Sequence, residues 1–328
     1  MNKKLVFIGS IFIIVVVAAV VLTRHKPAPP PVTTPQPTLA LPAPTGIFPQ
    51  PPNVTFSFAS PPSIPTSLPS YAFQPAPLSS VEQVAAKAAI TLNLGATPSA
   101  LTRGGSYAKT WSRPNEATLT VTQTNERVTL SFRQIKSVRP PVVIAPDVAV
   151  QQFLLALIPP TANLSVRAAG TTNGPFDGLL VLDTPAPTSF KNHFYSYALG
   201  AYPLLTPELS ITPISVIADS GGIIRFATIA LPPSSFQAGA SLTLLTANQI
   251  LASLTAGRGT LLDTHNPQTP DQGEVPNFSK FIIEDARIVY APKEKFLLPA
   301  LYMTGTGSAA GGAAQKATIF LWLSVGLP

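Results

Sequence analysis

The feature that most constrains this chain is a proline-rich, uncharged stretch near its N-terminus. Residues 27–77 hold 17 prolines among 51 residues, and no Lys, Arg, Asp or Glu occurs from residue 27 to residue 81. Such a segment buries too little surface to offset its ordering entropy, and its prolines favour the open polyproline II helix. It predicts an extended extracytoplasmic spacer over residues 23–78, so we expect the globular part to begin at Ser79.

The spacer follows an apolar run that is long enough to cross a membrane. Residues 5–22, LVFIGSIFIIVVVAAVVL, contain one Ser and no charge, and as a helix they would reach about 27 Å, close to the hydrocarbon thickness. We expect an uncleaved signal anchor in the cell membrane, with residues 1–4 as a cytoplasmic stub and the C-terminal domain extracytoplasmic. A cleaved signal peptide is the alternative, because Lys3 and Lys4 precede the run.

The formal charge of the chain, +7, comes largely from its first 26 residues. Lys3, Lys4, Arg24 and Lys26 lie there, and residues 27–328 carry 17 basic against 14 acidic side chains. This near balance argues against nucleic acid as a partner. The chain has no cysteine, which excludes disulfides and thiolate metal sites.

One local excess of basic residues remains between residues 103 and 139, where Glu116 and Glu126 are the only acidic residues. We identify it as a candidate surface for an anionic partner, such as anionic lipid or a cell-wall polymer. A solvated strand face is the alternative. Its members are Arg103, Lys109, Arg113, Arg127, Arg133, Lys136 and Arg139.

Periodicity and capping signals predict three helices in the folded part. The first begins at Ser79, where Ser79-Ser-Val-Glu82 fits a capping box, and Gly95 stops it. The second runs from Pro146 to Leu157, with proline at its start. The third runs from Thr246 to Ala256, with Thr246 as its cap.

Alternating apolar residues predict antiparallel strands between and after these helices. The expected strands are Ala117–Gln123 with Arg127–Arg133, residues 211–219 with 223–231, and a C-terminal meander over 281–290, 296–304 and 317–325. The fold class is therefore expected to be α+β, with helices packed on antiparallel sheets and a helix-plus-strands unit repeated around 79–132 and 246–325. We expect two α+β subdomains, at 79–145 and 146–328.

Short motifs of the folded part suggest a family. They are Trp111…Leu119-Thr-Val-Thr…Val128-Thr-Leu-Ser-Phe, then Ala256-Gly-Arg-Gly259, then Ile288-Val-Tyr290…Leu298-Pro-Ala-Leu-Tyr302. Behind a single N-terminal anchor, this region resembles the YycH/YycI type of membrane-anchored regulators and PepSY-like domains over residues 79–325. The resemblance implies a non-catalytic protein that binds another envelope component, in that family a sensor histidine kinase. The long proline spacer departs from the family pattern.

Reactive side chains are sparse in the folded part. Its histidines are His193 and His265, and no Gly-x-Ser-x-Gly motif occurs. The polar loop from residue 263 to residue 274 contains candidate metal ligands whose carboxylates suit Ca²⁺. They are Asp263, His265, Asp271 and Glu274. The EF-hand register is missing, so an ordinary connecting loop is the alternative, and we predict no catalytic residue, no cofactor and no metal.

Together these features predict a single-pass membrane-anchored extracytoplasmic binding or regulatory protein of the bacterial cell envelope that is not an enzyme. Its expected partner is a protein or a cell-wall polymer. An envelope hydrolase or metal-dependent enzyme is the first alternative, which a pocket joining His193 or His265 to a carboxylate and a Ser would favour. A self-associating structural surface or pilus-like protein is the second, which self-association of the 79–328 fragment would favour.

Overall fold

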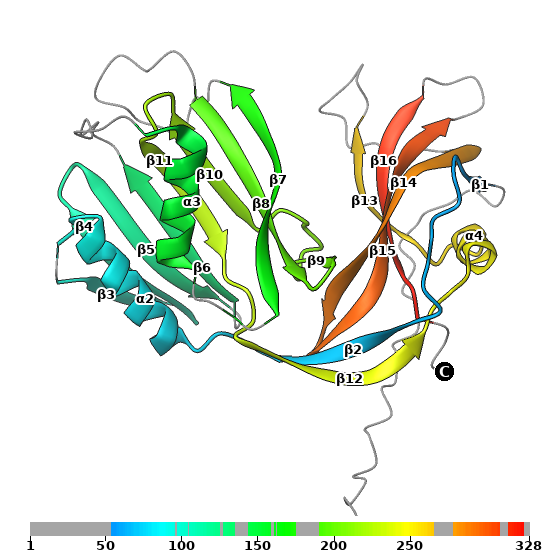
Figure 1. The fold of residues 1–328 in the computed structure, drawn as a ribbon, viewed down its shortest axis with the longest axis horizontal. Coiled ribbons are helices and arrows are strands. Elements are labelled where there is room, and N and C mark those ends of the chain that lie inside the picture. Colours follow the sequence, from blue (N-terminus) through cyan, green and yellow to red (C-terminus); the bar gives the residue numbers. More distant parts are fainter. Residues whose placement is uncertain are drawn as a thin grey trace, which may run out of the picture. The chain divides into compact units, whose positions relative to one another are not determined.

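Strands dominate the fold (Figure 1). The structure is a computed structural model; it describes residues 54–324 apart from residues 96, 104, 125–126, 135–143, 159–160, 162, 175–189, 266–277 and 309–313. Strands make up 58% of the described part and helices 16%. The predicted α+β class, with helices packed on antiparallel sheets, is therefore wrong, because a large mixed β-sheet dominates the chain.

The elements of the described part run in the following order. The strands are β1 (Thr55–Phe58), β2 (Ser67–Gln74), β3 (Ser99–Arg103), β4 (Ser106–Arg113), β5 (Ala117–Thr124), β6 (Arg127–Gln134), β7 (Leu164–Gly174), β8 (Phe190–Leu199), β9 (Tyr202–Leu204), β10 (Ile214–Asp219), β11 (Ile224–Ala230), β12 (Ser235–Thr243), β13 (Thr260–His265), β14 (Lys280–Lys293), β15 (Phe296–Ser308) and β16 (Gln315–Trp322). The helices are α2 (Leu78–Thr91), α3 (Pro146–Leu157) and α4 (Ala247–Thr255).

The fold class differs from the prediction because several strands arise from segments with weak strand signals. β1 and β2 lie within the proline-rich stretch predicted as spacer, so regular structure begins before Ser79. β1 pairs in parallel with β14, and β2 pairs with β12 and β15. These partners are distant in the sequence, and strand formation depends on such neighbours more than on intrinsic preference.

The three helices occur close to where the sequence predicts them. α4 has the predicted Thr246 cap, completed by Gln249 as a capping box, and α3 carries Pro146 in its first turn. The capping box predicted at the start of α2 is wrong. This helix begins behind Pro77 without a side-chain cap, and Glu82 instead accepts a hydrogen bond from Lys109 Nζ at 2.6 Å.

The strands follow one hydrogen-bonded path, in the order β12-β2-β15-β14-β9-β8-β10-β11-β6-β5-β4-β3. β1 joins β14, β7 joins β8, and β16 joins β15 and β13. The repeated helix-plus-strands unit does not describe this order. β2 and β12 come from outside either predicted repeat, β2 pairs with β15, and β12 pairs with β2. Two of the pairings with β14, those of β1 and β9, are parallel.

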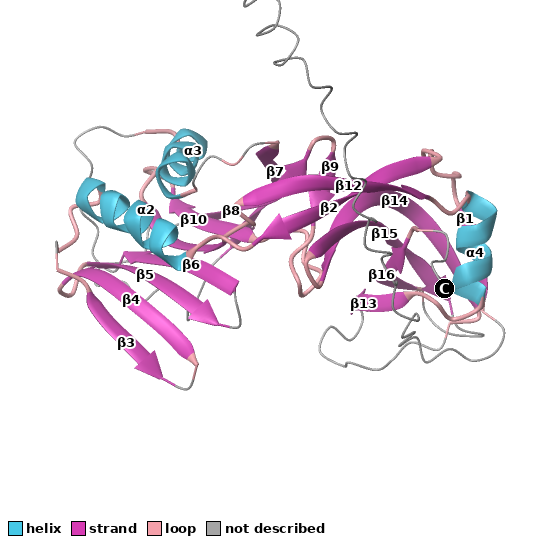
Figure 2. Cartoon of the chain, turned by 90° about the horizontal axis from the view of Figure 1, so that it is seen from below, coloured by secondary structure: helices cyan, strands magenta, loops and turns pink. Residues whose placement is uncertain are grey.

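Helices α2 and α3 lie on the same side of the strands β4–β6 (Figure 2). The buried face of these strands carries Leu119 and Phe132, which share a core with Val81 of α2. Phe132 also packs on Phe153 of α3, with ring centroids 5.2 Å apart. Alternation therefore places the threonines of β5 on the opposite face of the sheet.

That opposite face carries a row of hydroxyl side chains across neighbouring strands. Thr110, Thr120, Ser131, Thr228 and Ser215 are directly opposite one another along β4, β5, β6, β11 and β10. The Thr110 and Thr120 hydroxyls are 3.1 Å apart. The row ends at Ser215 and Thr228, beside a cavity described below.

A second core lies under α4. Ile250 and Leu254 of the helix pack with Phe281 of β14 and Ile319 of β16. Phe56 of β1 joins this core, with its ring 6.0 Å from that of Phe281. This contact anchors β1 within a proline-rich segment, because it buries an aromatic ring against the second core.

No helix within the described ranges is long and apolar enough to cross a membrane. The prediction of a transmembrane signal anchor is thus not met by any helix that the structure describes. The predicted span itself, residues 5–22, lies outside the described residues, as does the predicted stub at residues 1–4.

Candidate functional site

The basic residues predicted as one anionic-partner surface are divided between the two faces of the sheet. Lys109 and Arg113 are paired in register with Val121 and Ala117, which belong to the buried helix-covered face. The side chains of Arg103, Arg127 and Arg133 lie on the opposite face. Lys136 and Arg139 lie outside the described residues.

Three of these basic side chains have carboxylate partners. Lys109 Nζ is 2.6 Å from Glu82 Oε2 and 5.7 Å from the ring centroid of Trp111. Arg113 pairs with Glu116, and Arg127 pairs with Glu208. These contacts neutralise much of the local excess of positive charge that the sequence shows.

The candidate metal ligands are only partly described. Asp263 and His265 lie in β13, opposite Thr318 and Lys316 of β16, and Asp271 and Glu274 lie outside the described residues. Among the residues that the structure describes, no three His, Asp or Glu side chains are grouped as a metal site.

His193 is a buried residue of β8. Its side chain is 2% exposed, and its Nδ1 lies 3.3 Å from Asp147 Oδ1 of α3. Within the described ranges its Nε2 has no hydrogen-bond partner. Burial lowers the pKa of His193, although the Asp147 carboxylate acts in the opposite direction. This environment favours a neutral imidazole, and His193 lines neither of the cavities described below.

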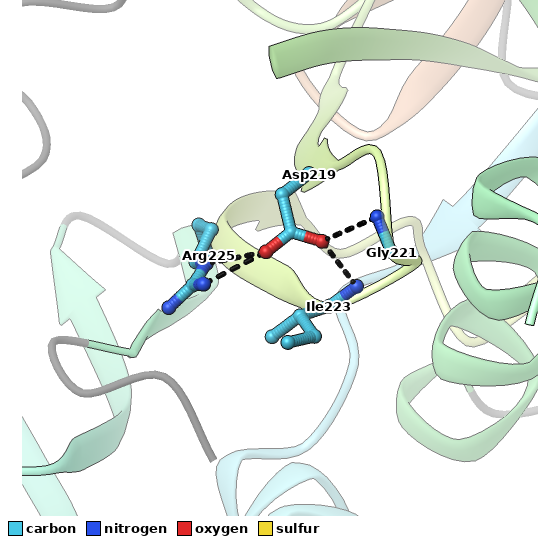
Figure 3. A network of polar contacts seen from close by, with 4 residues as sticks. All are labelled: Asp219, Gly221, Ile223 and Arg225. Carbon is cyan, nitrogen blue, oxygen red and sulfur yellow. Dashed lines mark hydrogen bonds and ion pairs between the residues drawn. The ribbon is translucent and has the colours of Figure 1, made fainter. Parts of the chain in front are cut away.

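A second buried polar group, the pair Asp219 and Arg225, is structural (Figure 3). Asp219 Oδ2 accepts hydrogen bonds from Arg225 Nε at 3.0 Å and Nη2 at 2.7 Å. Its other oxygen accepts from the backbone N–H groups of Gly221 and Ile223. These contacts fix the turn between β10 and β11, which the sequence predicts as a hairpin. Both oxygens of the Asp219 carboxylate therefore already accept hydrogen bonds.

The candidate site is an apolar cavity of about 270 Å³, just below the usual range for small-molecule sites. Its walls come from β2, β6, β8, the segments around β9 and β11, and the β14–β15 turn. Apolar side chains such as Phe73, Leu204 and Leu297 contribute to it. We refer to it as the apolar cavity.

Six prolines line the apolar cavity, which gives its wall an unusual character. They are Pro75, Pro207, Pro213, Pro232, Pro233 and Pro292. Because proline has no backbone N–H and a fixed φ, such a wall is stiff and offers few hydrogen-bond donors. The wall segments are also tied together: the Leu231 N–H donates to the Val128 carbonyl at 2.9 Å, and the Phe73 N–H to the Lys295 carbonyl at 3.0 Å.

One polar group of the cavity stands out. Tyr197 of β8 is 2% exposed and lines the apolar cavity. Its hydroxyl is buried, and no described residue forms a hydrogen bond with it. Burial raises the pKa of the Tyr197 hydroxyl, so the group stays neutral and can both donate and accept. A buried polar atom without a partner is costly. Because the hydroxyl itself has almost no accessible surface, it lies behind the cavity wall rather than in it.

A second cavity, of about 230 Å³, adjoins the first. The two share four lining residues, Arg127, Thr206, Pro213 and Ala230. The second is lined by five hydroxyl side chains, and we refer to it as the hydroxyl cavity. They are Thr206, Ser210, Thr212, Ser215 and Thr228.

The ion pair of Arg127 and Glu208 lies at the hydroxyl cavity. Glu208 belongs to a tight loop in which the Thr206 N–H donates to the Ser210 carbonyl at 3.0 Å and the Leu209 N–H to the Thr206 carbonyl at 2.9 Å. Leu209 has a positive φ of 60°, an uncommon conformation for a residue with a side chain. The loop thus places Glu208 beside Arg127, and both side chains remain partly exposed.

Sequence reasoning missed this site almost completely. Arg127 is among the predicted basic residues, but Tyr197 and the prolines of the wall are not singled out by any motif. The one sequence signal is the frequency of proline in the loops, as at Pro232-Pro233, which indicates turns but not that they face each other.

No protein-family model matches the chain, and no curated protein matches it closely enough to count as a relative. The resemblance to the YycH/YycI type therefore stays a prediction.

Proposed function

We propose that the folded region is a non-catalytic binding module that holds a small ligand, or a group of a larger partner, in the apolar cavity. The observation that carries this proposal is the preformed apolar cavity itself, whose wall is stiffened by six prolines. Apolar sites with few placed polar groups are the usual form of a ligand pocket.

The placement of the ionisable groups also supports binding rather than catalysis. The apolar cavity is lined by two charged side chains, Arg127 and Glu294, and Arg127 is held by Glu208. A general base needs a perturbed carboxylate or imidazole within reach of the substrate. His193, whose Nδ1 lies 3.3 Å from Asp147 Oδ1, does not line the cavity.

We further propose that the binding module acts outside the cytoplasm, in the bacterial cell envelope. The apolar run at residues 5–22, the uncharged proline-rich stretch behind it and the absence of cysteine support this location. Protease added to intact cells is expected to remove a C-terminal epitope. Protection of the epitope in intact cells, with cleavage after lysis, would contradict the proposal.

Photocrosslinking tests the binding function directly. The photoreactive residue p-benzoylphenylalanine replaces Pro207, which is exposed and lines the apolar cavity. The matched control carries the same residue at Pro114, an exposed turn proline that lines neither cavity. Illumination of intact cells is expected to give an adduct of discrete mass with the Pro207 variant and not with the Pro114 variant.

Two results would overturn the proposal. Identical adducts with both variants, or none with either, would show that the cavity has no specific ligand. If the captured compound, incubated with the purified full chain, were converted to a product, the module would be an enzyme.

A further inference from the structure

Strand β3 forms one end of the hydrogen-bonded strand path, where it pairs with β4 alone among the described strands. All five of its residues, Ser99–Arg103, are exposed. Both faces of β3 are therefore in solvent, and no described element covers its outer edge, which Figure 2 shows at the margin of the sheet. An uncovered edge strand presents unpaired backbone N–H and C=O groups to another strand.

Leu101 lies in the middle of this edge strand. Its side chain is 66% exposed. In register it is opposite Ala108 of β4, on the face of the sheet that the helices leave open. A single exposed leucine is common on protein surfaces, but this one lies where a neighbouring strand would cover it.

The features that usually protect an edge strand are sparse in β3. They include lysine, proline and β-bulges. Ser99–Arg103 contains no proline and no lysine, and its register with β4 has no shift. Its one charged residue, Arg103, is the last residue of the strand. The middle of the edge is thus open to backbone pairing.

The backbone groups that point outward from this edge belong to Ala100 and Thr102. Two residues separate Arg103 from Ser106, its register partner, as in a two-residue hairpin, whose flanking residues form a hydrogen-bonded pair. Hydrogen-bonded and non-hydrogen-bonded pairs alternate along an antiparallel ladder. Leu101 therefore directs its N–H and C=O toward β4, whereas Ala100 and Thr102 direct theirs away from it.

This pattern is complementary to a second copy of itself. A twofold axis at Leu101 places this residue opposite its own copy, and Ala100 opposite Thr102 of the partner subunit. The two leucines then form a close, non-hydrogen-bonded pair, and each flanking pair exchanges two backbone hydrogen bonds. Arg103 comes opposite Ser99 of the partner subunit, so like charges are not placed opposite each other.

We propose that β3 is a self-association edge, through which two copies of this chain pair antiparallel and continue one sheet across a twofold axis. A peptide of another protein would need pockets for its alternate side chains, and no residue of β3 lines either cavity. The proposal is independent of ligand binding in the apolar cavity. Five residues from each copy make a small contact, so we expect a weak dimer that exchanges rapidly.

Disulfide trapping detects such a dimer, and the chain has no cysteine of its own. Cells that produce the full chain with Leu101→Cys are treated with a membrane-permeant oxidant, and the products are separated under non-reducing conditions. The proposed pairing places the two substituted residues about 4.5 Å apart between Cα atoms, within disulfide reach. We expect a product at twice the 34.4 kDa of the chain that disappears on reduction.

Two matched variants control for random collision. Leu155→Cys replaces a leucine of α3 that is 82% exposed. Ser99→Cys replaces an exposed residue of β3 that the proposed register places about 14 Å from its own copy. We expect little dimer from either variant. A yield from either one that equals the yield from Leu101→Cys, or no dimer from Leu101→Cys, would overturn the proposal.

Proline in the edge tests the backbone pairing. Ala100→Pro, added to the Leu101→Cys chain, removes an outward N–H but no bond to β4, and proline is tolerated where an edge strand faces solvent. We expect it to abolish the trapped dimer, whereas Ala100→Val retains it. A dimer that persists with Ala100→Pro contradicts the pairing.

Thermal unfolding establishes whether the proline variant is folded. If it is not, the comparison of Leu101→Cys with Leu155→Cys and Ser99→Cys alone decides. A disulfide from Leu101→Cys to another protein, in place of the dimer, would show that a different partner uses this edge and would overturn self-association.

Discussion

At the scale of single residues, the buried polar groups of this protein differ in the hydrogen bonds that compensate their burial. Asp219 and Arg225 are 4% and 2% exposed and bind each other through two hydrogen bonds. The Tyr197 hydroxyl is equally buried but lacks a partner among the described residues. The Asp219–Arg225 pair stabilises a turn, whereas the Tyr197 hydroxyl is buried without a compensating hydrogen bond, and burial alone does not distinguish the two cases.

Removing one member of the buried pair is expected to destabilise the protein strongly. Asp219→Ala leaves the Arg225 charge buried without its carboxylate, which typically costs about 3–5 kcal/mol. Urea unfolding measures the loss. The control is Asp285→Ala: Asp285 pairs with Arg287 at 2.6 Å, but both side chains are exposed, so about 0–1 kcal/mol is expected. Equal losses in the two variants would contradict a structural role for the Asp219 pair.

His193 is expected to make stability depend on pH. Its pKa in the folded state is lowered by burial, with Asp147 opposing and Lys191 reinforcing the shift. Below about pH 6.5, the ordinary histidine value, the unfolded chain binds a proton that the folded chain does not. The contribution of His193 is therefore present above that pH and lost as the pH falls.

The measurement compares the free energy of unfolding at about pH 7.5 and about pH 5 for the wild type and for His193→Gln. The wild type is expected to lose more stability than the variant over this interval. An identical pH dependence in both proteins would show that His193 does not titrate differently on folding.

At the scale of elements, local hydrogen bonds determine where α4 begins. The Thr246 hydroxyl accepts from the Gln249 N–H, and the Gln249 side chain accepts from the Thr246 N–H at 2.8 Å. This reciprocal arrangement satisfies two backbone groups that a helix start otherwise leaves unpaired. It orients Ile250 and Leu254 into the second core.

Thr246→Ala is expected to lower the free energy of unfolding by about 1 kcal/mol, the typical value for loss of an N-cap. The matched control is Thr255→Ala at the other end of α4, where the Thr255 hydroxyl donates to the Leu251 carbonyl. That bond does not satisfy an unpaired N–H group at the start of the helix. We therefore expect a smaller loss of unfolding free energy for Thr255→Ala in chemical unfolding. A larger loss at Thr255 would contradict the importance of the cap.

At the scale of the whole molecule, strands from the beginning of the described chain pair with strands near its end in the same β-sheet. β1 pairs with β14, β2 pairs with β15, and the Tyr290 hydroxyl donates to the Pro69 carbonyl at 2.8 Å. Residues 54–74 are therefore part of the folded region rather than its tether. Tyr71 and Phe73 pack against the core shared by α2, α3 and β4–β6, so this part of the proline-rich segment docks on the domain.

A fragment that begins at Ser79 is thus expected to be less stable than one that begins at residue 54. Its loss of β1 and β2 removes Phe56 from the second core and exposes the edges of β14 and β15, and uncovered edges promote association. Urea unfolding and light scattering of the two fragments test this. Equal stability, with both fragments monomeric, would contradict it.

The sequence by itself determined the features that depend on near neighbours. The helix starting at Pro146, the Thr246 cap and the hairpin turn at Gly222, where φ is 81°, follow from side chains and backbone within a few residues of each other. Only the tertiary structure decided that Thr55–Phe58 and Ser67–Gln74 are strands, because their pairing energy comes from partners more than 150 residues away. The same holds for the cavity around Tyr197: its walls meet through long-range contacts that leave no periodic trace in the sequence.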